Sequence, residues 1–276
     1  MITRQNLHMH STYDDGKDSC ECMLSACMKA SLASAGISLH SPLPFQNDWA
    51  AASIYVSGYL REMASLKCRF GQAFQVYTGI EWDVLSDPAE LDRFDYVIGS
   101  VHHLPVCAVP PSVDNTPEET AGCIQKYFGG DADAAATCYF NELLKVASEP
   151  RVSICGHFDL LLKFNERMPL FNPESPAYIK AGQTALDALL DAGKIIEVNT
   201  GAISRGWRST PYPEAFWLRE IARRGGSVLI SSDAHSSAHV VTGFDAAEAL
   251  LISCGFDHVM ERSTSGAFQP VPLGKH

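Results

Sequence analysis

The chain has 276 residues, of which 46% are apolar and 19% are charged, and its formal net charge is −11. This composition provides for a sizeable core and is not that of a disordered protein. The negative charge and the lack of a long basic run disfavour long nucleic acid or an anionic membrane as the main partner. A small substrate is compatible with it, because a local cationic metal site overrides the global charge.

The chain start and the cysteines bear on the compartment. Met1 to Arg4 lead straight into a short strand pattern, without the apolar region of a secretory signal. No stretch approaches the roughly 18 uninterrupted apolar residues that a membrane helix needs. Nine cysteines are present, but the cluster of Cys20, Cys22 and Cys27 does not complete a zinc-finger spacing. We therefore expect a cytoplasmic protein with reduced cysteines and no membrane partner.

Strand-like and helix-like segments alternate in the first hundred residues. The predicted elements are a strand at Asn6–Thr12, a helix at Cys20–Ser34, a strand at Ile37–His40, a helix at Trp49–Phe70, and strands at Gln75–Val84 and Asp95–His102. Gly36 is expected to end the first helix as a left-handed C-terminal cap.

The second half continues this alternation after a longer connection. Residues 104–150 are predicted to be an inserted lid or wall with helices at Pro117–Phe128 and Asp133–Ala147. The elements expected after it are strands at Arg151–His157, Lys194–Asn199 and Ser227–Ser232, and helices at Pro173–Ala192, Pro211–Arg224 and Asp245–Cys254. Gly193 and the pair Gly225-Gly226 are expected to end two of these helices.

Alternating strands and helices imply a parallel sheet. Seven such units in about 250 residues favour a closed α/β barrel in a single domain over residues 1–276, with the insert at about 104–150. No GxGxxG pattern follows the first strand, so the signature of a dinucleotide-binding fold is absent. Catalytic groups of such barrels lie at the C-terminal ends of the strands.

Side chains of the kind that bind metals appear where these strands end. The nine candidate ligands are His8, His10, Asp15, His40, Glu81, His102, His157, Asp233 and His235. Residues two apart on a strand point to the same side, so His8 and His10 face one way together. Singly, each candidate is equally well a hydrogen-bonded core histidine, an ion pair or a turn aspartate. Together, they predict one metal centre at the rim of the barrel.

The ligand types constrain the metal. Imidazole and carboxylate ligands together suit zinc, iron or manganese better than calcium or magnesium alone. Nine ligands exceed what one ion with an open position can use, so we expect two or three divalent ions, with Glu81 as a bridging carboxylate. Their surplus positive charge favours an anionic small-molecule substrate, most simply a phosphate ester.

The motifs resemble those of the PHP (polymerase and histidinol phosphatase) superfamily, and most closely its stand-alone histidinol-phosphate phosphatases. The motifs, in family order, are His8-Met9-His10-Ser11, Asp15-Gly16, His40-Ser41-Pro42-Leu43-Pro44, Gly79-Ile80-Glu81, Gly99-Ser100-Val101-His102, Gly156-His157-Phe158-Asp159, Glu197-Val198-Asn199-Thr200 and Ser232-Asp233-Ala234-His235-Ser236. They span nearly the whole chain. In one departure, Leu39 stands where the family usually has an acidic residue before the second-strand histidine, which would remove a partner of His40.

The resemblance implies a distorted (β/α)7 barrel with a trinuclear metal site at the C-terminal ends of its strands. His8, His10, Glu81 and Asp233 would serve one ion, and Glu81 would bridge to a second. The implied reaction is hydrolysis of L-histidinol phosphate to L-histidinol and phosphate, a step of histidine biosynthesis. The alternative within the superfamily is another small phosphate ester or a short nucleotide.

The expected chemistry is attack on phosphorus by a hydroxide that bridges two ions. Arg205 is the best candidate for a phosphate clamp, because a guanidinium can bond two oxygens at once. Lys163 and Arg208 are weaker candidates for the same role. Asp233 or His235 would protonate the leaving alkoxide, and the sequence does not choose between them.

Two other classes of protein are less consistent with the chain. A metal-dependent amide hydrolase on a related barrel typically carries a carboxylated lysine at an inner strand end, where this chain has Glu81. A non-catalytic binding module is disfavoured by the full set of ligands.

Overall fold

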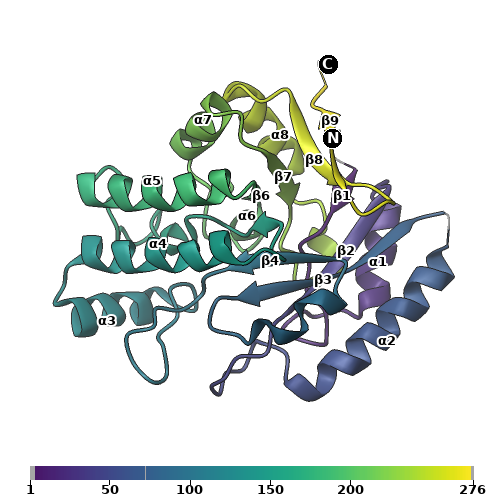
Figure 1. Ribbon diagram of the computed structural model, residues 1–276, viewed down its shortest axis with the longest axis horizontal. Helices are drawn as coiled ribbons and strands as arrows, with labels where there is room; N and C mark the ends of the chain where they lie inside the picture. Colours follow the sequence, from purple (N-terminus) through teal and green to yellow (C-terminus); the bar gives the residue numbers. More distant parts are fainter. Residues whose placement is uncertain (1–3, 72, 275–276) are drawn as a thin grey trace.

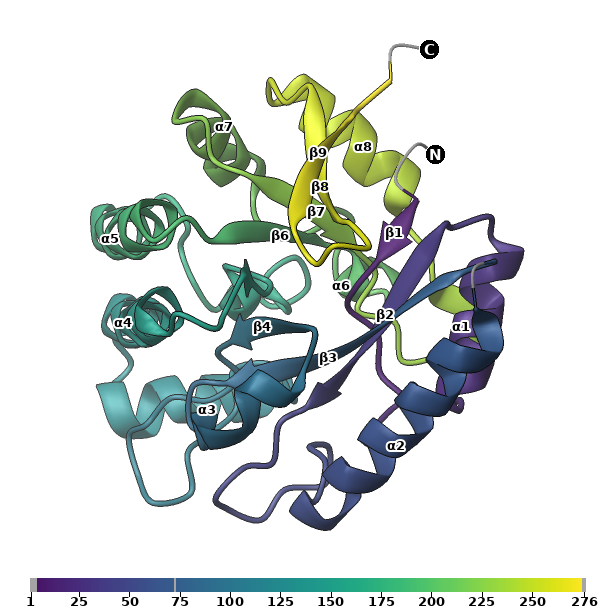
Figure 2. The same cartoon turned by 45° about the vertical axis from the view of Figure 1, so that its right-hand side comes forward.

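The computed structural model describes residues 4–71 and 73–274. Within them, seven parallel strands follow one another around one sheet in sequence order (Figure 2). Their bounds are β1 Gln5–Asn6, β2 Ser34–His40, β3 Gln75–Asp83, β4 Tyr96–Ser100, β5 Ile154–Cys155, β6 Ile195–Asn199 and β7 Val228–Ser231. β1 and β5 are shorter than predicted, because only two residues of each keep the regular pairing.

The first and last strands meet just beyond their ordered pairing. Met9 forms a parallel bridge with Ala234, and the backbone N–H of His10 donates to the carbonyl of Ala234 at 3.0 Å. The Asn6 side chain adds a hydrogen bond of 2.6 Å to the Ser232 hydroxyl. The sheet therefore closes into a distorted (β/α)7 barrel, which confirms the predicted fold class.

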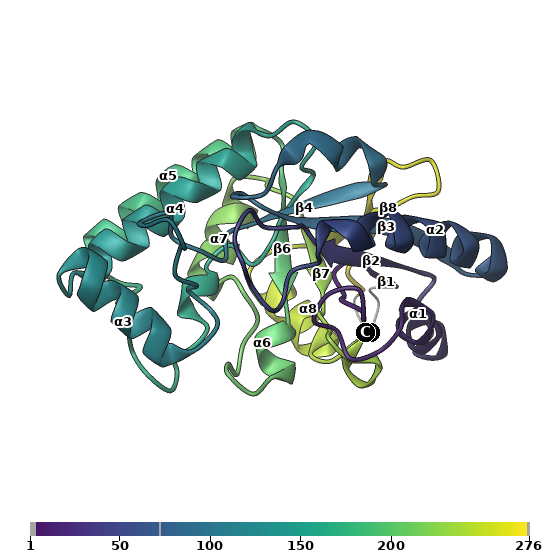
Figure 3. The same cartoon turned by 90° about the horizontal axis from the view of Figure 1, so that it is seen from below.

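Helices surround this barrel. The longer ones are α1 Cys20–Lys29, α2 Ser53–Phe70, α3 Pro117–Phe128, α4 Ala132–Ser148, α5 Pro176–Asp191, α7 Ala215–Arg223 and α8 Phe244–Ser253, and the short ones are α6 Gly201–Ser204, η1 Pro88–Arg93, η2 Leu160–Leu162 and η3 Ser237–His239. Figures 1 and 3 show α3, α4 and α5 on one side of the barrel and α1 and α2 on the other. The helix α6 was not predicted, since one turn leaves no periodic pattern.

Capping residues explain where several helices begin. The Thr116 hydroxyl accepts the Glu119 N–H before α3, and the Ser175 hydroxyl accepts the Tyr178 N–H before α5. A proline follows each cap at the first helical position, where its missing N–H costs no hydrogen bond. The sequence therefore predicted where both helices begin to within a few residues.

Segment 104–150 holds α3 and α4, close to the two predicted helices. α4 carries the chain from β4 to β5, and its Tyr139 and Phe140 are buried. The Phe140 ring meets Tyr178 of α5 edge-on at 5.1 Å. α4 is thus part of the ring of helices, and α3 with the loop before it is the additional element.

The end of α1 differs from the prediction. The helix stops at Lys29, and Ser31, with φ of 65°, takes the left-handed position that had been assigned to Gly36. Gly36 instead lies within β2, where a Cβ atom would stand 2.3 Å from the Tyr96 hydroxyl. Gly79 in β3 is equally close to the Tyr96 ring, at 2.1 Å. Both glycines make room inside the barrel for Tyr96, whose hydroxyl donates to the Leu7 carbonyl.

A Gly79→Ala substitution is therefore expected to lower the free energy of unfolding by about 2 kcal/mol, because the tyrosine ring must move in a packed interior. Urea unfolding followed by fluorescence measures this change. A matched substitution at Gly122, where a Cβ atom meets nothing within 4 Å, is expected to stabilise α3 slightly. Equal midpoints for the two variants would contradict the packing argument.

A C-terminal hairpin was not predicted. It consists of β8 His258–Arg262 and β9 Phe268–Pro272, which pair antiparallel. The Gln5 side chain and the Arg262 backbone exchange hydrogen bonds of 2.9 and 2.7 Å, and the Tyr77 hydroxyl donates to the Arg262 carbonyl. The hairpin thus lies beside β1 (Figure 1) and against the starts of β1 and β3, opposite the strand ends that carry the predicted metal ligands.

Two further observations concern the whole chain. All nine cysteines are free thiols. Among the described residues, no helix has the length and apolar character needed to cross a membrane.

Candidate metal centre

Glu81, at the end of β3, lies among imidazole rings from four other strand ends. Its Oε2 atom is 3.0 Å from both His8 Nε2 and His40 Nδ1. Its Oε1 atom is 3.2 Å from His102 Nε2 and 2.9 Å from His157 Nε2. The parallel strands bring residues that are up to 149 positions apart along the chain to one carboxylate, since all these strands end on the same side of the barrel.

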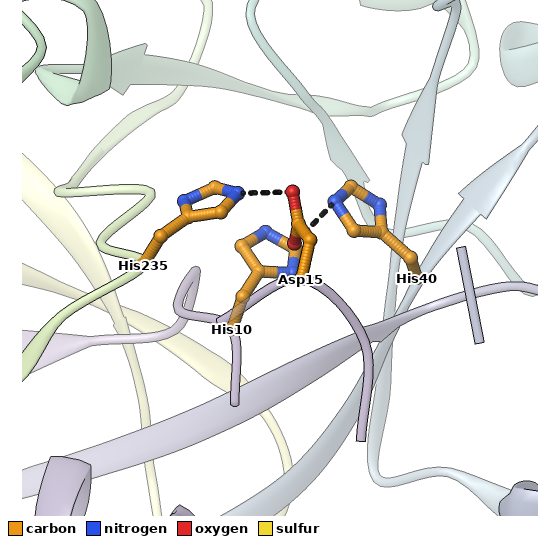
Figure 4. Close-up of side chains that lie close together, drawn as sticks. All are labelled: His10, Asp15, His40 and His235. Carbon is orange, nitrogen blue, oxygen red and sulfur yellow. Dashed lines mark ion pairs between the residues drawn. The ribbon is translucent and has the colours of Figure 1, made fainter. Parts of the chain in front are cut away.

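A second group of side chains lies at the mouth of the barrel. His10, Asp15, His40 and His235 offer ligand atoms that all lie within 4.8 Å of one another. Figure 4 shows their side chains pointing toward a common space, with Asp15 between His40 and His235. The Asp15 oxygens are 3.7 Å from His40 Nε2 and 3.2 Å from His235 Nε2. The Asp15 side chain is 31% exposed, so this group opens toward solvent.

The third group consists of His8, His10 and Asp233. Asp233 Oδ1 is 3.4 Å from His10 Nε2 and 3.8 Å from His8 Nε2. Asp233 has a φ of 47°, in the left-handed region that side chains other than glycine seldom adopt. Such strained backbone is concentrated at functional sites. The three groups, together with His157 beside Glu81, place all nine predicted ligands at one rim of the barrel.

The hydrogen bonding of this rim fits the presence of cations. His8 Nε2, His10 Nε2 and Glu81 Oε2 are buried, and none of them has a hydrogen-bond partner within the described part of the chain. A buried polar atom without a partner costs about 1–3 kcal/mol, and three at one point would be expensive. Divalent ions satisfy imidazole nitrogens and carboxylate oxygens at once, so the donor set fits them.

Buried carboxylates hold the other nitrogen of three of these rings. The pairs, with their N–O distances, are His8 with Glu197 at 2.6 Å, His10 with Asp14 at 3.0 Å, and His102 with Asp83 at 3.0 Å. Such pairing fixes the ring orientation and leaves the opposite nitrogen for a metal. These three carboxylates were not predicted in this role. A signal existed for Glu197, which interrupts the apolar strand Ile195–Asn199.

Glu197 is fully buried and accepts four donors. They are the His8 ring, the His157 backbone N–H at 2.8 Å, the Asn199 side chain at 2.9 Å and the Ser231 hydroxyl. A Glu197→Gln substitution replaces one accepting oxygen with an amide N–H₂ group, which cannot accept the hydrogen bonds of the donors that face it. We expect it to lower the free energy of unfolding by about 2 kcal/mol. Urea unfolding tests this, with the exposed Glu118→Gln as the control; equal stability of the two variants would contradict the assignment.

The charges in the centre shift the pKa values of its members. Burial alone would raise the pKa of Glu81, but the neighbouring His8, His40 and His102 bring it well below the usual value. Burial lowers the pKa of His10, but Asp14, Asp233 and Glu81 together more than compensate and raise it to about 10. Protons and metal ions therefore compete for these nitrogens, and metal binding is expected to weaken as the pH falls.

Leu39 does not leave His40 without partners. The Leu39 side chain is buried in an apolar cluster with Met9 and Cys27, on the outer face of β2. His40 Nδ1 lies near Glu81, and the Trp49 ring meets the His40 ring edge-on at 4.5 Å. The absence of an acidic residue at this position is thus accommodated by apolar packing.

The three predicted phosphate-binding residues differ in position. Arg205 lines the cavity over the centre and donates to Asp233 Oδ2 at 2.9 Å. Lys163 also lines it, but its ammonium donates to the Asp114 side chain at 3.0 Å. Arg208 is buried away from the cavity and donates to the Leu162 carbonyl. Its position does not support the predicted contact with phosphate, because its guanidinium is used to hold the loop around it.

The cavity has a volume of about 370 Å³, which suits a small molecule. Seven of the nine candidate ligands line it. The other lining residues are Asp48, Trp49, Ser112, Asp114, Asn115, Leu160, Lys163 and Arg205.

Known proteins resemble the chain over most of its length. The PHP domain family matches residues 6–201. A probable histidinol-phosphatase of Schizosaccharomyces pombe is 27% identical over 207 residues, which are 71% of this chain and 65% of that relative. The chain thus spans slightly less than two thirds of the length of this relative. A probable histidinol-phosphatase of Deinococcus radiodurans is 27% identical over 237 residues, 82% of each chain.

A solved structure has the same fold. Histidinol phosphate phosphatase of Lactococcus lactis, in complex with zinc, L-histidinol and phosphate, superposes with a TM-score of 0.74. The match covers 98% of this chain and 100% of that one, at 18% identity. Since the family match covers well over half of the chain and includes seven of the nine convergent residues, the chain belongs to the PHP domain family.

Proposed function

We propose that the protein is a metal-dependent phosphatase that hydrolyses a small phosphomonoester, and that the ester is L-histidinol phosphate. The observation that carries this proposal is the convergence of six imidazoles and two further carboxylates with Glu81, some of whose buried atoms have no hydrogen-bond partner among the described residues. Two or three zinc, iron or manganese ions are the cofactors that suit this set of ligands.

The three groups share members, which supports a multinuclear centre. His10 and His40 each belong to two of the groups. Glu81 presents one oxygen toward His8 and His40 and the other toward His102 and His157, so it is placed to bridge two ions. When bound, the ions would lower the pKa of water toward roughly 7 and neutralise the charge of the transferring phosphoryl group.

Arg205 is proposed to bind the non-bridging oxygens of the phosphate. One of its terminal nitrogens is 2.9 Å from Asp233 Oδ2 and the other is 3.1 Å from His235 Nδ1, so it lies beside two proposed ligands. A planar guanidinium with several donors matches the geometry of phosphate. Lys163 contributes positive charge on the same cavity wall, although Asp114 holds its ammonium group.

Proton donation to the leaving oxygen is assigned to His235 rather than Asp233. The Asp233 side chain is 7% exposed, and Arg205 and Asn199 donate to it. The His235 side chain is 22% exposed and lines the cavity. An imidazole at the cavity surface can donate a proton to the leaving oxygen when it does not bind an ion, whereas the pKa of Asp233 is held well below its usual value despite its burial, so this carboxylate carries no proton to give.

The identity of the ester rests on the relatives and on the cavity. Two relatives are named probable histidinol-phosphatases, and the Lactococcus protein binds L-histidinol and phosphate. The cavity wall also carries Asp48 and Asp114, which belong to none of the three ligand groups. Lys163 already pairs with Asp114, so the carboxylate of Asp48 is the one on this wall that favours an ester bearing an amine and disfavours a nucleotide, which would bring further negative charge.

Phosphate release from a panel of esters tests this proposal. Protein purified without chelator and supplied with zinc or manganese is expected to release phosphate from L-histidinol phosphate, with a kcat/KM at least about tenfold above that for nucleoside monophosphates. Addition of a chelator is expected to abolish turnover. Faster hydrolysis of nucleotides would overturn the choice of ester, and the absence of release from every ester would overturn the function.

A further inference from the structure

One buried carboxylate contacts two strand ends of the metal centre at once. Asp14 lies in the turn that follows His10, and its side chain is fully buried. Its Oδ2 atom is 3.0 Å from His10 Nδ1 and also accepts the backbone N–H of His40 at 2.9 Å. Its Oδ1 atom accepts the Ser11 N–H at 2.8 Å. Asp14 therefore connects the end of the first strand segment with the end of β2.

The two histidines that Asp14 contacts are those shared between ligand groups. His10 belongs with Asp15 and His235 in one group and with His8 and Asp233 in another. His40 belongs to the first of these groups and also to the group with Glu81 and His102. The His10 and His40 rings stack at 4.0 Å between centroids, with 16° between their planes. The relative position of these two rings consequently sets how the groups are spaced.

We propose that Asp14 is a positioning residue that couples the ion sites of the centre, an inference that rests on the proposed metal-dependent function. Its carboxylate accepts the Nδ1–H of His10, which leaves the Nε2 lone pair of that ring for an ion. Through the backbone of His40 the same oxygen fixes the end of β2. The Asp14 side chain thus aligns His10 with His40 on the next strand, and each of these histidines is shared by two ligand groups.

Within residues 4–71 and 73–274, no neighbouring side chain performs this task. The Asp15 carboxylate turns the other way, toward His235 and His40 Nε2. Leu39 is buried in the apolar cluster on the outer face of β2. An asparagine at position 14 has one accepting oxygen, whereas Asp14 receives three donors on two oxygens, so the amide must turn an N–H₂ group toward at least one donor.

The test measures zinc affinity, by titration against a competing chelator, for the full chain and its variants. Asp14→Asn and Asp14→Ala are expected to weaken zinc binding about 10–100-fold, the usual effect of losing a carboxylate behind a metal-binding imidazole. Asp18→Asn is the matched control, because Asp18 anchors the same loop to Ser237 without touching a histidine. The thermal midpoint of unfolding of each metal-free variant shows whether the variant is still folded. If Asp14→Ala unfolds, Asp14→Asn, which preserves the shape of the side chain, is used alone to test the proposal.

The possible outcomes distinguish a failure of the positioning role of Asp14 from a failure of the proposed metal-dependent function. A lower zinc affinity in Asp14→Asn, with an unchanged metal-free midpoint and a control that binds as the unsubstituted protein does, supports the positioning role. Zinc affinity in Asp14→Asn equal to that of the control overturns it. If the unsubstituted protein binds no zinc, manganese or iron, the proposed function itself fails.

Discussion

Replacing Glu81 with glutamine is expected to remove both metal and turnover. The glutamine keeps the shape of the side chain, but one of its two terminal atoms becomes an N–H₂ donor among four imidazoles that now face carboxylate oxygens. Loss of a carboxylate behind a ligand typically costs about 10–100-fold, so loss of a bridging ligand should lower metal affinity and kcat/KM by more than about a hundredfold. Metal analysis and phosphate release measure the two effects.

Glu90→Gln is the control for this substitution. Glu90 is a largely exposed glutamate of η1 that pairs with Arg93, away from the centre. Its replacement is expected to leave metal content and turnover unchanged. If Glu81→Gln also kept its metal and its turnover, Glu81 would not be a bridging ligand.

Replacing Arg205 with methionine is expected to lower kcat/KM about 100–1,000-fold while the metal content stays unchanged. The guanidinium lines the cavity and lies beside Asp233 and His235, where the phosphate would be bound. Removal of one donor to developing charge in a transition state usually costs this much. Arginine is not a metal ligand, so its loss should separate substrate binding from metal binding.

A conservative variant at position 205 and a control variant elsewhere complete this test. Arg205→Lys keeps the charge but not the planar pair of donors, so it should recover only part of the activity. Arg219→Met, at an exposed position of α7, should have no effect. Full activity in Arg205→Met would contradict the assignment of Arg205 as the phosphate-binding residue.

The sequence predicted the barrel because strand and helix periodicities alternate along it. It also predicted the convergence of the nine candidate ligands, since each lies near the end of a predicted strand or in the turn beyond it, and the ends of parallel strands meet. The pattern could not show how the side chains behind them pair. The contacts of Asp14 with His10 and of Asp83 with His102 depend on tertiary packing, which leaves no local pattern in the sequence.

Local features of the sequence explain why some elements and residues were not predicted correctly. The hairpin of β8 and β9 carries prolines at 270 and 272 and a polar turn, so it lacks a clear strand pattern. Glycine commonly ends helices, so the sequence favours Gly36 as a helix cap, whereas Ser31 adopts the left-handed conformation and Tyr96 requires the glycine at position 36. Arg208 was a weaker candidate than Arg205 for phosphate binding, and of these two only Arg205 lines the cavity.

The content of zinc, iron and manganese in protein purified without chelator, measured by mass spectrometry, tests the central claim most directly. Two or three ions per chain are expected, and the Glu81→Gln variant should retain fewer. A chain that carries none of these ions, even after incubation with each of them, would contradict the account.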